Sequence, residues 1–270
     1  MMVLQLFHQS GRAARDQGLI MDMQQTARIV GSQIADEVRM AGQGVPLFAA
    51  SFDPGPSEAA AVILPSSSAN RIDFRAGLSN VETGVATPGP LDLTMGVSLA
   101  LSIADGAGFA AGKYVYVYGP GSNSAWLWVR AELTQTSRSS LTLIPRQTGS
   151  AGAIVHFIAA PTVSLEEAVS IYLAAGSVRR ATANDMTDPA NPGWAAANEI
   201  GRSFSALTFT YYDARGNVVV PNALALRAII ARVDISLTVR AADRLTDASQ
   251  PQYSLAMRTI PRNLRLRPAN

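Results

Sequence analysis

Apolar residues near the start of the chain recur every three or four positions, which is the spacing of one face of an α-helix. The opposite face is polar and includes Asp36 and Arg39, which are close enough in sequence to pair. Gly42 is suited to end the helix, and Pro46 prevents it from resuming. The pattern predicts one helix over residues 2–41, about 60 Å long. Its apolar face comprises Ile20, Met23, Ala27, Val30, Ile34, Val38 and Ala41.

The first half of this predicted helix lacks the apolar stripe of the second half. Residues 9–17 are polar or small on most sides, and the chain is apolar again only near its start. A helix that is longer than one domain needs and loses its stripe is expected to leave its own domain. The apolar residues near the start of this helix are Val3, Leu4, Leu6 and Phe7.

Beyond the helix, the pattern changes to short segments in which apolar and polar residues alternate between turn residues. Such alternation is typical of half-buried β-strands. It is clearest in "YVYVY" (114–118) and "WLWVR" (126–130), and the stretches "DGAG" and "GPGSNS" mark tight turns. This pattern predicts an all-β module over residues 88–146.

The C-terminal residues 147–270 repeat this pattern and predict an antiparallel sheet. "AVSIYLAAGSVRRAT" and "ALTFTYYDARGNVVV" are expected to be hairpins, the second with its turn at residues 213–217. A long strand then follows in "AIIARVDISLTVRAA", and "YSLAMRTIPRNLRLR" is expected to be the final strand. The residues of the long strand that we expect to point inward are Ile229, Ala231, Val233, Ile235 and Leu237.

Residues 44–87 separate the helix from the module and are rich in proline and serine. We predict a loop-rich connection with a short strand at "RIDFRAG" and a linker at "ETGVATPGP" (82–90). The predicted fold class is therefore α+β. A long N-terminal helix (residues 1–43) packs on an antiparallel sheet, and the all-β module is an addition to that core.

Composition narrows the function classes. The 270 residues include no cysteine, which excludes disulfides, thiolate metal sites and cysteine nucleophiles. The net charge is only +2 and no arginine cluster is interleaved with aromatic residues, so we expect no nucleic-acid partner. The sequence contains no apolar run of about 18 residues that could span a membrane.

Few residues suit catalysis. The histidines are His8, on the half of the helix that lacks the apolar stripe, and His156, which we expect to be half-buried on a strand. Adjacent carboxylates such as Glu166 and Glu167 diverge on a strand or a helix, so they suit general acid–base work poorly. We expect them to be solvated loop charges. Since no catalytic constellation is found, we predict a structural or interaction protein rather than an enzyme.

Two further groups have alternative interpretations. Oxygen ligands at Asp213 and Asn217, with Asp185 and Asp188, could hold Ca²⁺, although turn chemistry alone explains these residues; no other cofactor is expected. Trp126 and Trp128 share one face of a predicted strand. They could bind a sugar or a partner if exposed, or form a core or a contact between modules if buried.

The stretch "ARIVGSQIADEVRMAGQGVP" resembles the end of the helix in minor type IV pilins and type II secretion minor pseudopilins, of the PilW-like and GspJ-like groups. "FSALTFTYYDARGNVVV" and "ARVDISLTVRA" are similar to a hairpin and a strand of that family, and "AVSIYLAAGSVRRAT" to another of its hairpins. The resemblance covers roughly residues 20–45 and 150–265. The helix positions that carry it are Ala27, Arg28, Ile34, Arg39, Met40, Ala41 and Gly42.

The resemblance implies a pilin-like fold and a minor subunit that associates with other minor subunits to prime, and cap, a type IV pilus or a pseudopilus. Implied partners are other minor pilins or pseudopilins and the major pilin. The resemblance also implies that the first half of the helix projects and packs against other subunits, and the residues expected to make contacts there are Val3, Leu4, Leu6 and Phe7. The family is anchored in the inner membrane by an apolar helix, has a periplasmic domain, and then moves to the pilus or cell surface. Residues 1–7 look like the last turns of that helix, so this chain is expected to be the soluble fragment.

Two alternatives remain open at this point. The first is a surface or tip adhesin-like protein that binds through the β-module. The second is a hydrolase with an unrecognised site. Glycan binding that depends on Trp126 or Trp128 would favour the former, and turnover in a substrate screen would favour the latter.

Overall fold

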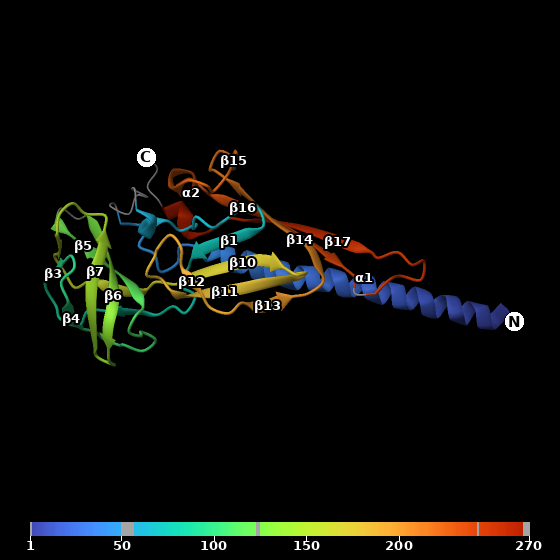
Figure 1. Cartoon of the computed structure of the whole chain (residues 1–270), viewed down its shortest axis with the longest axis horizontal. Coiled ribbons are helices and arrows are strands. Elements are labelled where there is room, and N and C mark those ends of the chain that lie inside the picture. Colours follow the sequence, from blue (N-terminus) through green and yellow to red (C-terminus); the bar gives the residue numbers. More distant parts are fainter. Residues whose placement is uncertain (1, 50–56, 123–124, 242, 267–270) are drawn as a thin grey trace.

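The structure is a computed structural model that describes residues 2–49, 57–122, 125–241 and 243–266, with side chains described from Ser10 to Leu264 within these ranges. It is an α+β protein with one long N-terminal helix and antiparallel strand pairings. The N-terminal part of the helix α1 (Met2–Arg39) projects at one end of the molecule, and a β-rich part forms the other end (Figure 1). Two sheets lie between these ends, alongside the C-terminal half of α1 (Figure 1).

The two sheets nearest α1 form the body of the molecule together with the helix segment that packs on them. One sheet pairs its strands in the order β1-β10-β11-β12, with β13 also on β11, and the other in the order β15-β14-β16-β17. The first consists of β1 (Arg71–Arg75), β10 (Ala168–Ala174), β11 (Ser177–Asp185), β12 (Gly193–Trp194) and β13 (Asn198–Gly201). The second consists of β14 (Phe204–Tyr212), β15 (Val218–Val219), β16 (Arg232–Arg240) and β17 (Gln252–Thr259).

The predicted stripe of α1 faces the body as expected. Met23, Ala27, Val30, Ile34, Val38 and Ala41 are buried in the main core, whereas Ile20 is more than one third exposed. Gly31 allows the helix to approach closely, because a Cβ there would lie 2.5 Å from Cε of Met257. An ion pair adds to this packing: Arg180 on β11 donates its Nε–H to the Glu37 carboxylate at 2.7 Å.

A second sheet system forms the β-module, here residues 81–165. Its strands pair in the order β2-β9-β5-β6-β7-β4, and a separate ribbon joins β3 and β8. The strands are β2 (Glu82–Gly84), β3 (Leu91–Thr94), β4 (Leu99–Ser102), β5 (Tyr114–Pro120), β6 (Trp126–Thr136), β7 (Ser140–Thr148), β8 (Ile154–Phe157) and β9 (Thr162–Leu165). The module therefore uses strands on both sides of the range 88–146 that the sequence suggested.

The β5–β6 hairpin has two buried faces. Val115, Val117 and Val129 point into a core that belongs to the β-module alone. Tyr116 and Trp128 point the other way and belong to the main core of the body. Alternate residues of one hairpin thus contribute to two different cores, because successive side chains of a strand point to opposite faces of the sheet.

Several local predictions were wrong. The expected linker at 82–90 begins with strand β2, which pairs with β9. The expected long strand begins only at Arg232, because residues 224–228 form the short helix α2 (Leu224–Ala228). Ile229 follows α2 and is 50% exposed, so it does not point inward, whereas Val233, Ile235 and Leu237 do. The last predicted strand ends at Thr259 and is followed by a 3₁₀ turn, η3 (Asn263–Leu266).

In the described residues of the connection after α1, most positions lie outside helices and strands. Within its described part, η1 (Glu58–Ala60) forms one 3₁₀ turn, and residues 62–64 run beside β1. The strand predicted at "RIDFRAG" is β1. These residues matter for the next subsection because they bring Glu58 and Ala59 to the junction between the body and the β-module.

Candidate functional site

The N-terminal half of α1 is the first candidate site. The described side chains from Ser10 to Asp22 are exposed or partly exposed, and Met21 is 67% exposed. One turn of this half is held by the loop between β16 and β17: the Thr246 hydroxyl donates to the Asp16 carboxylate at 2.9 Å, and Arg15 lies 3.6 Å from Asp243. The segment N-terminal to this contact projects away from the body (Figure 1).

Gly11 and Gly18 lie in this exposed half. A Cβ at either position would meet no atom of the chain within 4 Å, and neither glycine has a positive φ. Glycine inside a helix is less favourable than alanine by about 1 kcal/mol. The packing and backbone of the described chain therefore give no reason for glycine at these two positions.

Four of the predicted interaction residues, Val3, Leu4, Leu6 and Phe7, lie in α1 but outside the described side chains. Their expected role as a contact surface stays a prediction. His8 lies in the same part of the helix, and its side chain is likewise outside the described set.

The structure separates the two other predicted interaction residues. Trp128 is 1% exposed and lies in the main core, with its ring 6.2 Å from that of Tyr116. Trp126 is 41% exposed and packs edge-to-face on Phe48 at 5.1 Å, and Phe48 packs in the same way on Tyr118 at 5.4 Å. On this face of β6, Trp128 therefore lies in the contact between the body and the β-module, whereas Trp126 lies at the exposed rim of the module.

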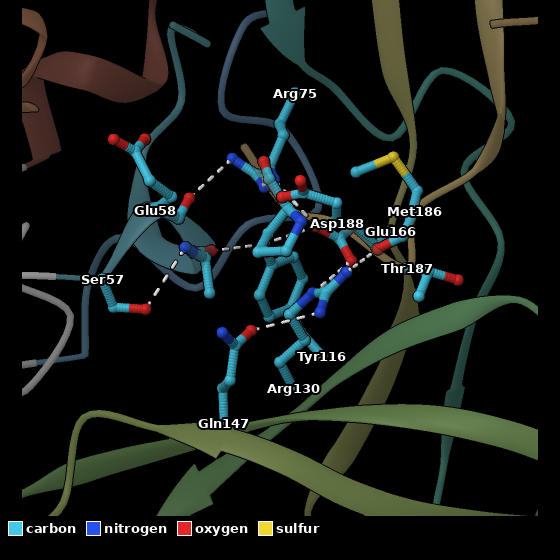
Figure 2. Close-up of polar contacts among 12 residues, drawn as sticks. Ser57, Glu58, Arg75, Tyr116, Arg130, Gln147, Glu166, Met186, Thr187 and Asp188 are labelled. Atoms are coloured by element: carbon cyan, nitrogen blue, oxygen red, sulfur yellow. Dashed lines mark hydrogen bonds and ion pairs between the residues drawn. The ribbon is translucent and has the colours of Figure 1, made fainter. Parts of the chain in front are cut away.

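Glu166 contradicts the prediction of a solvated loop charge. Its side chain is fully buried and accepts a hydrogen bond from Arg75 Nε at 2.8 Å and another from Arg130 Nε at 2.7 Å (Figure 2). Arg75 belongs to β1 of the body and Arg130 to β6 of the β-module. Burial of three charges is stabilising only when all of them are paired and hydrogen-bonded.

Further donors of the two guanidinium groups also find acceptors. Arg75 donates to the carbonyl oxygens of Glu58 at 3.1 Å and Pro189 at 2.6 Å, and also to that of Ala61. Arg130 donates to the Gln147 side chain at 3.1 Å and to the Met186 carbonyl (Figure 2). The two guanidinium groups are therefore fixed by backbone carbonyls as well as by the carboxylate.

Tyr116 completes the cluster. Its hydroxyl donates to the Ala59 carbonyl at 2.7 Å and lies 3.2 Å from Glu166 Oε1. Burial, and then the charge of Glu166, raise the pKa of Tyr116 well above its ordinary value, so the phenol stays protonated and keeps its hydrogen bond. The neighbouring Glu167 is only partly buried and accepts from the Ser79 hydroxyl at 2.7 Å.

The described residues that the sequence suggested for catalysis or calcium binding are not brought together in one site. His156 is exposed rather than half-buried, and its Nδ1 lies 2.5 Å from Asp92 Oδ1 on the neighbouring strand. Asp185, Asp188 and Asp213 each accept hydrogen bonds from residues of their own turn. Among the residues that the structure describes, no group of three or more His, Asp or Glu side chains is arranged to hold a metal ion.

Comparison with known proteins does not identify the chain: no model of a protein family matches it, and a search of curated proteins finds no match.

Within the described part of the chain, no helix combines the length and the apolar character that crossing a bilayer requires.

Proposed function

We propose that this protein is a minor pilin or pseudopilin, which associates with other minor subunits to prime assembly of a type IV pilus or a type II secretion pseudopilus and sits at its tip. The observation that carries the proposal is the division of α1. A helix of 38 residues, about 57 Å long, buries its apolar stripe in its own body from Met23 onward and projects N-terminal to its contact at Asp16. Such a half-free helix is suited to pack against helices of other subunits.

The exposed glycines support this assignment. Small residues allow two helices to approach closely, and Gly11 and Gly18 have free space where a partner backbone could lie. Met21 and Ile29 add exposed apolar side chains on the surface of α1 that does not face the sheets. The proposed partners are other minor subunits and the major pilin, and the proposed mechanism is association rather than turnover.

The proposal includes a location. The family that the sequence resembles is held in the inner membrane by an apolar segment ahead of the periplasmic domain and then enters the filament. If this protein acts in that way, the mature N-terminus in membrane fractions of the source cells carries about 20 apolar residues before the present chain. Mass spectrometry of that N-terminus measures this directly.

The association itself can be tested by affinity purification from the source cells, with the full chain as bait and proteomic identification of what is retained. The expected result is enrichment of filament subunits with the natural chain, and loss of this enrichment with Met21→Asp. Val218→Asp is the matched control, because Val218 is also exposed but lies on β15. Equal recovery of filament subunits with both variants, or none with the natural chain, would contradict the proposal.

A second candidate function is glycan binding at the rim of the β-module. The observation that favours it is the exposed Trp126, whose ring is held in place by Phe48. Trp128 is buried and cannot contact a ligand in this structure. Binding on a glycan array that Trp126→Ala removes and Met21→Asp retains would support this function, and an array without signal would count against it.

A further inference from the structure

The chain joins the β-module to the body through two neighbouring segments, residues 76–81 and 165–167. These segments pair with each other: the Ala76 amide donates to the Glu167 carbonyl at 3.1 Å, and the Leu165 amide donates to the Val81 carbonyl at 3.0 Å. The connection is therefore a two-stranded stem. Two units joined in this way move relative to each other by default, unless their interface holds them.

Glu166 lies on this stem and contacts both sides. One carboxylate oxygen accepts from Arg75 of the body, and the other accepts from Arg130 of the β-module. The side chains of all three residues are at most 1% exposed. A rotation of the module about the stem would separate Arg130 from Glu166 and leave buried charges unpaired.

Further contacts cross the same junction from module to body. The Tyr116 hydroxyl donates to the Ala59 carbonyl, the Arg130 guanidinium donates to the Met186 carbonyl, and Lys113 Nζ donates to the Asn184 carbonyl at 2.7 Å. Figure 2 shows Tyr116 and Arg130 side by side near Glu166, with Arg75 of the body approaching from the opposite direction. These bonds have fixed directions, whereas apolar packing alone tolerates sliding.

The charges explain why Glu166 is the central residue. The buried cluster holds two guanidinium groups and one carboxylate, so removal of the carboxylate leaves two like charges close together in a low-dielectric site. The β-module has an apolar core of its own, which can persist when the contact is lost, whereas the core of the body also takes in Tyr116 and Trp128 of the module.

We propose that Glu166 is a latch that holds the β-module in a single orientation on the helix-bearing body. The molecule is then one rigid rod rather than two tethered parts. Any surface of the module, including the rim at Trp126, is presented at a fixed position relative to α1. The inference does not depend on the proposed function, because it concerns only contacts within this chain.

The orientation can be measured in the full chain, which contains no cysteine and so accepts labels at chosen sites. Ser32 on α1 and Ser139 in the turn between β6 and β7 are both exposed. With Ser32→Cys and Ser139→Cys carrying spin labels, pulsed electron resonance gives the distribution of distances between them. A single narrow distribution is expected, and a broad or two-peaked one would overturn the proposal.

The role of Glu166 is tested by Glu166→Gln in the same labelled chain. The amide keeps the shape but turns an N–H group toward one guanidinium, so the distribution should broaden roughly twofold or more. Glu132→Gln is the control: it removes the same charge from an exposed pair with Arg146 on the module and should leave the width unchanged. If Glu166→Gln does not fold, Arg130→Lys, which keeps the charge, decides in its place. An unchanged width of the distance distribution in the variant that folds would overturn the proposal.

Discussion

Gly18 and Gly31 lie on the same helix in opposite surroundings. A side chain at Gly18 would enter open space, whereas one at Gly31 would collide with Met257 and press on Leu237 and Leu255. The packing of the fold therefore requires a glycine at position 31 but not at position 18. This difference can be tested with the same substitution at both positions.

Gly31→Leu is expected to lower the free energy of unfolding by about 2 kcal/mol, because overpacking forces α1 away from β16 and β17. Gly18→Leu is expected to leave it unchanged or to raise it by up to ~1 kcal/mol through helix propensity. Urea unfolding of both variants measures the difference. Equal losses at the two positions would show that Gly18 is also packed within the chain.

Asp213 gives a prediction for pH. Hydrogen bonds from the Asn217 side chain and from the backbone amides of the turn hold the pKa of this exposed carboxyl below its usual range. A lowered pKa in the folded state means that the stabilisation is present above the unfolded pKa of about 3.9 and is lost as pH falls through the folded value. The stability difference between the natural chain and Asp213→Asn should therefore shrink below about pH 4. A difference that stays constant from pH 6 to pH 2 would contradict this.

At the scale of elements, the β16–β17 hairpin extends along α1 and contacts its exposed half at Asp16 (Figure 1). Asp16 accepts from both the amide and the hydroxyl of Thr246. This contact sets how far along α1 the body reaches. What lies N-terminal to it is the projecting part.

Asp16→Ala should release the hairpin tip from α1 with little change in global stability, about 0.5 kcal/mol or less, since the contact is exposed. Hydrogen exchange should become faster for the described amides near Thr246 and for the turn of α1 at Asp16, and remain slow for β16. Gln25→Ala on the exposed face of α1 serves as a control. If exchange near Thr246 does not change, the hairpin is held by other contacts.

The elements that the sequence predicted well are those with a local signal. The period of the apolar residues placed the packed half of α1, and alternation placed β5, β6 and the β10–β11 and β14–β15 hairpins. The run "ALRAIIARVDISL" contains no glycine or proline that would mark a boundary, so α2 was not separated from the strand that follows it. Short apolar runs do not distinguish a helical turn from a strand.

The buried cluster could not be predicted in this way. Glu166 pairs with residues 91 and 36 positions away, and nothing in its neighbourhood distinguishes it from a surface glutamate. The partner arginines lie on strands with buried neighbours on both sides, where a charged residue is ordinarily expected to face solvent. Only the topology brings the three side chains together.

At the scale of the whole molecule, the projecting helix, the body and the β-module follow one another along a single long axis (Figure 1). Under the proposed function, the projecting helix packs against a different surface of the next subunit, and head-to-tail contacts of this kind either propagate into filaments or close into rings. The arrangement places the β-module at the end far from the projecting helix.

The most direct test of the central claim is site-specific photocrosslinking in the source cells, with the crosslinking residue placed at Met21 on the exposed half of α1. The proposal predicts crosslinks to other subunits of a pilus or pseudopilus, which should be absent when the residue stands at the exposed Val218 on β15. Gly18→Leu should weaken them without lowering the stability of the chain. If Met21 gives no filament subunit above the Val218 control, α1 is not an assembly interface and the assignment is wrong.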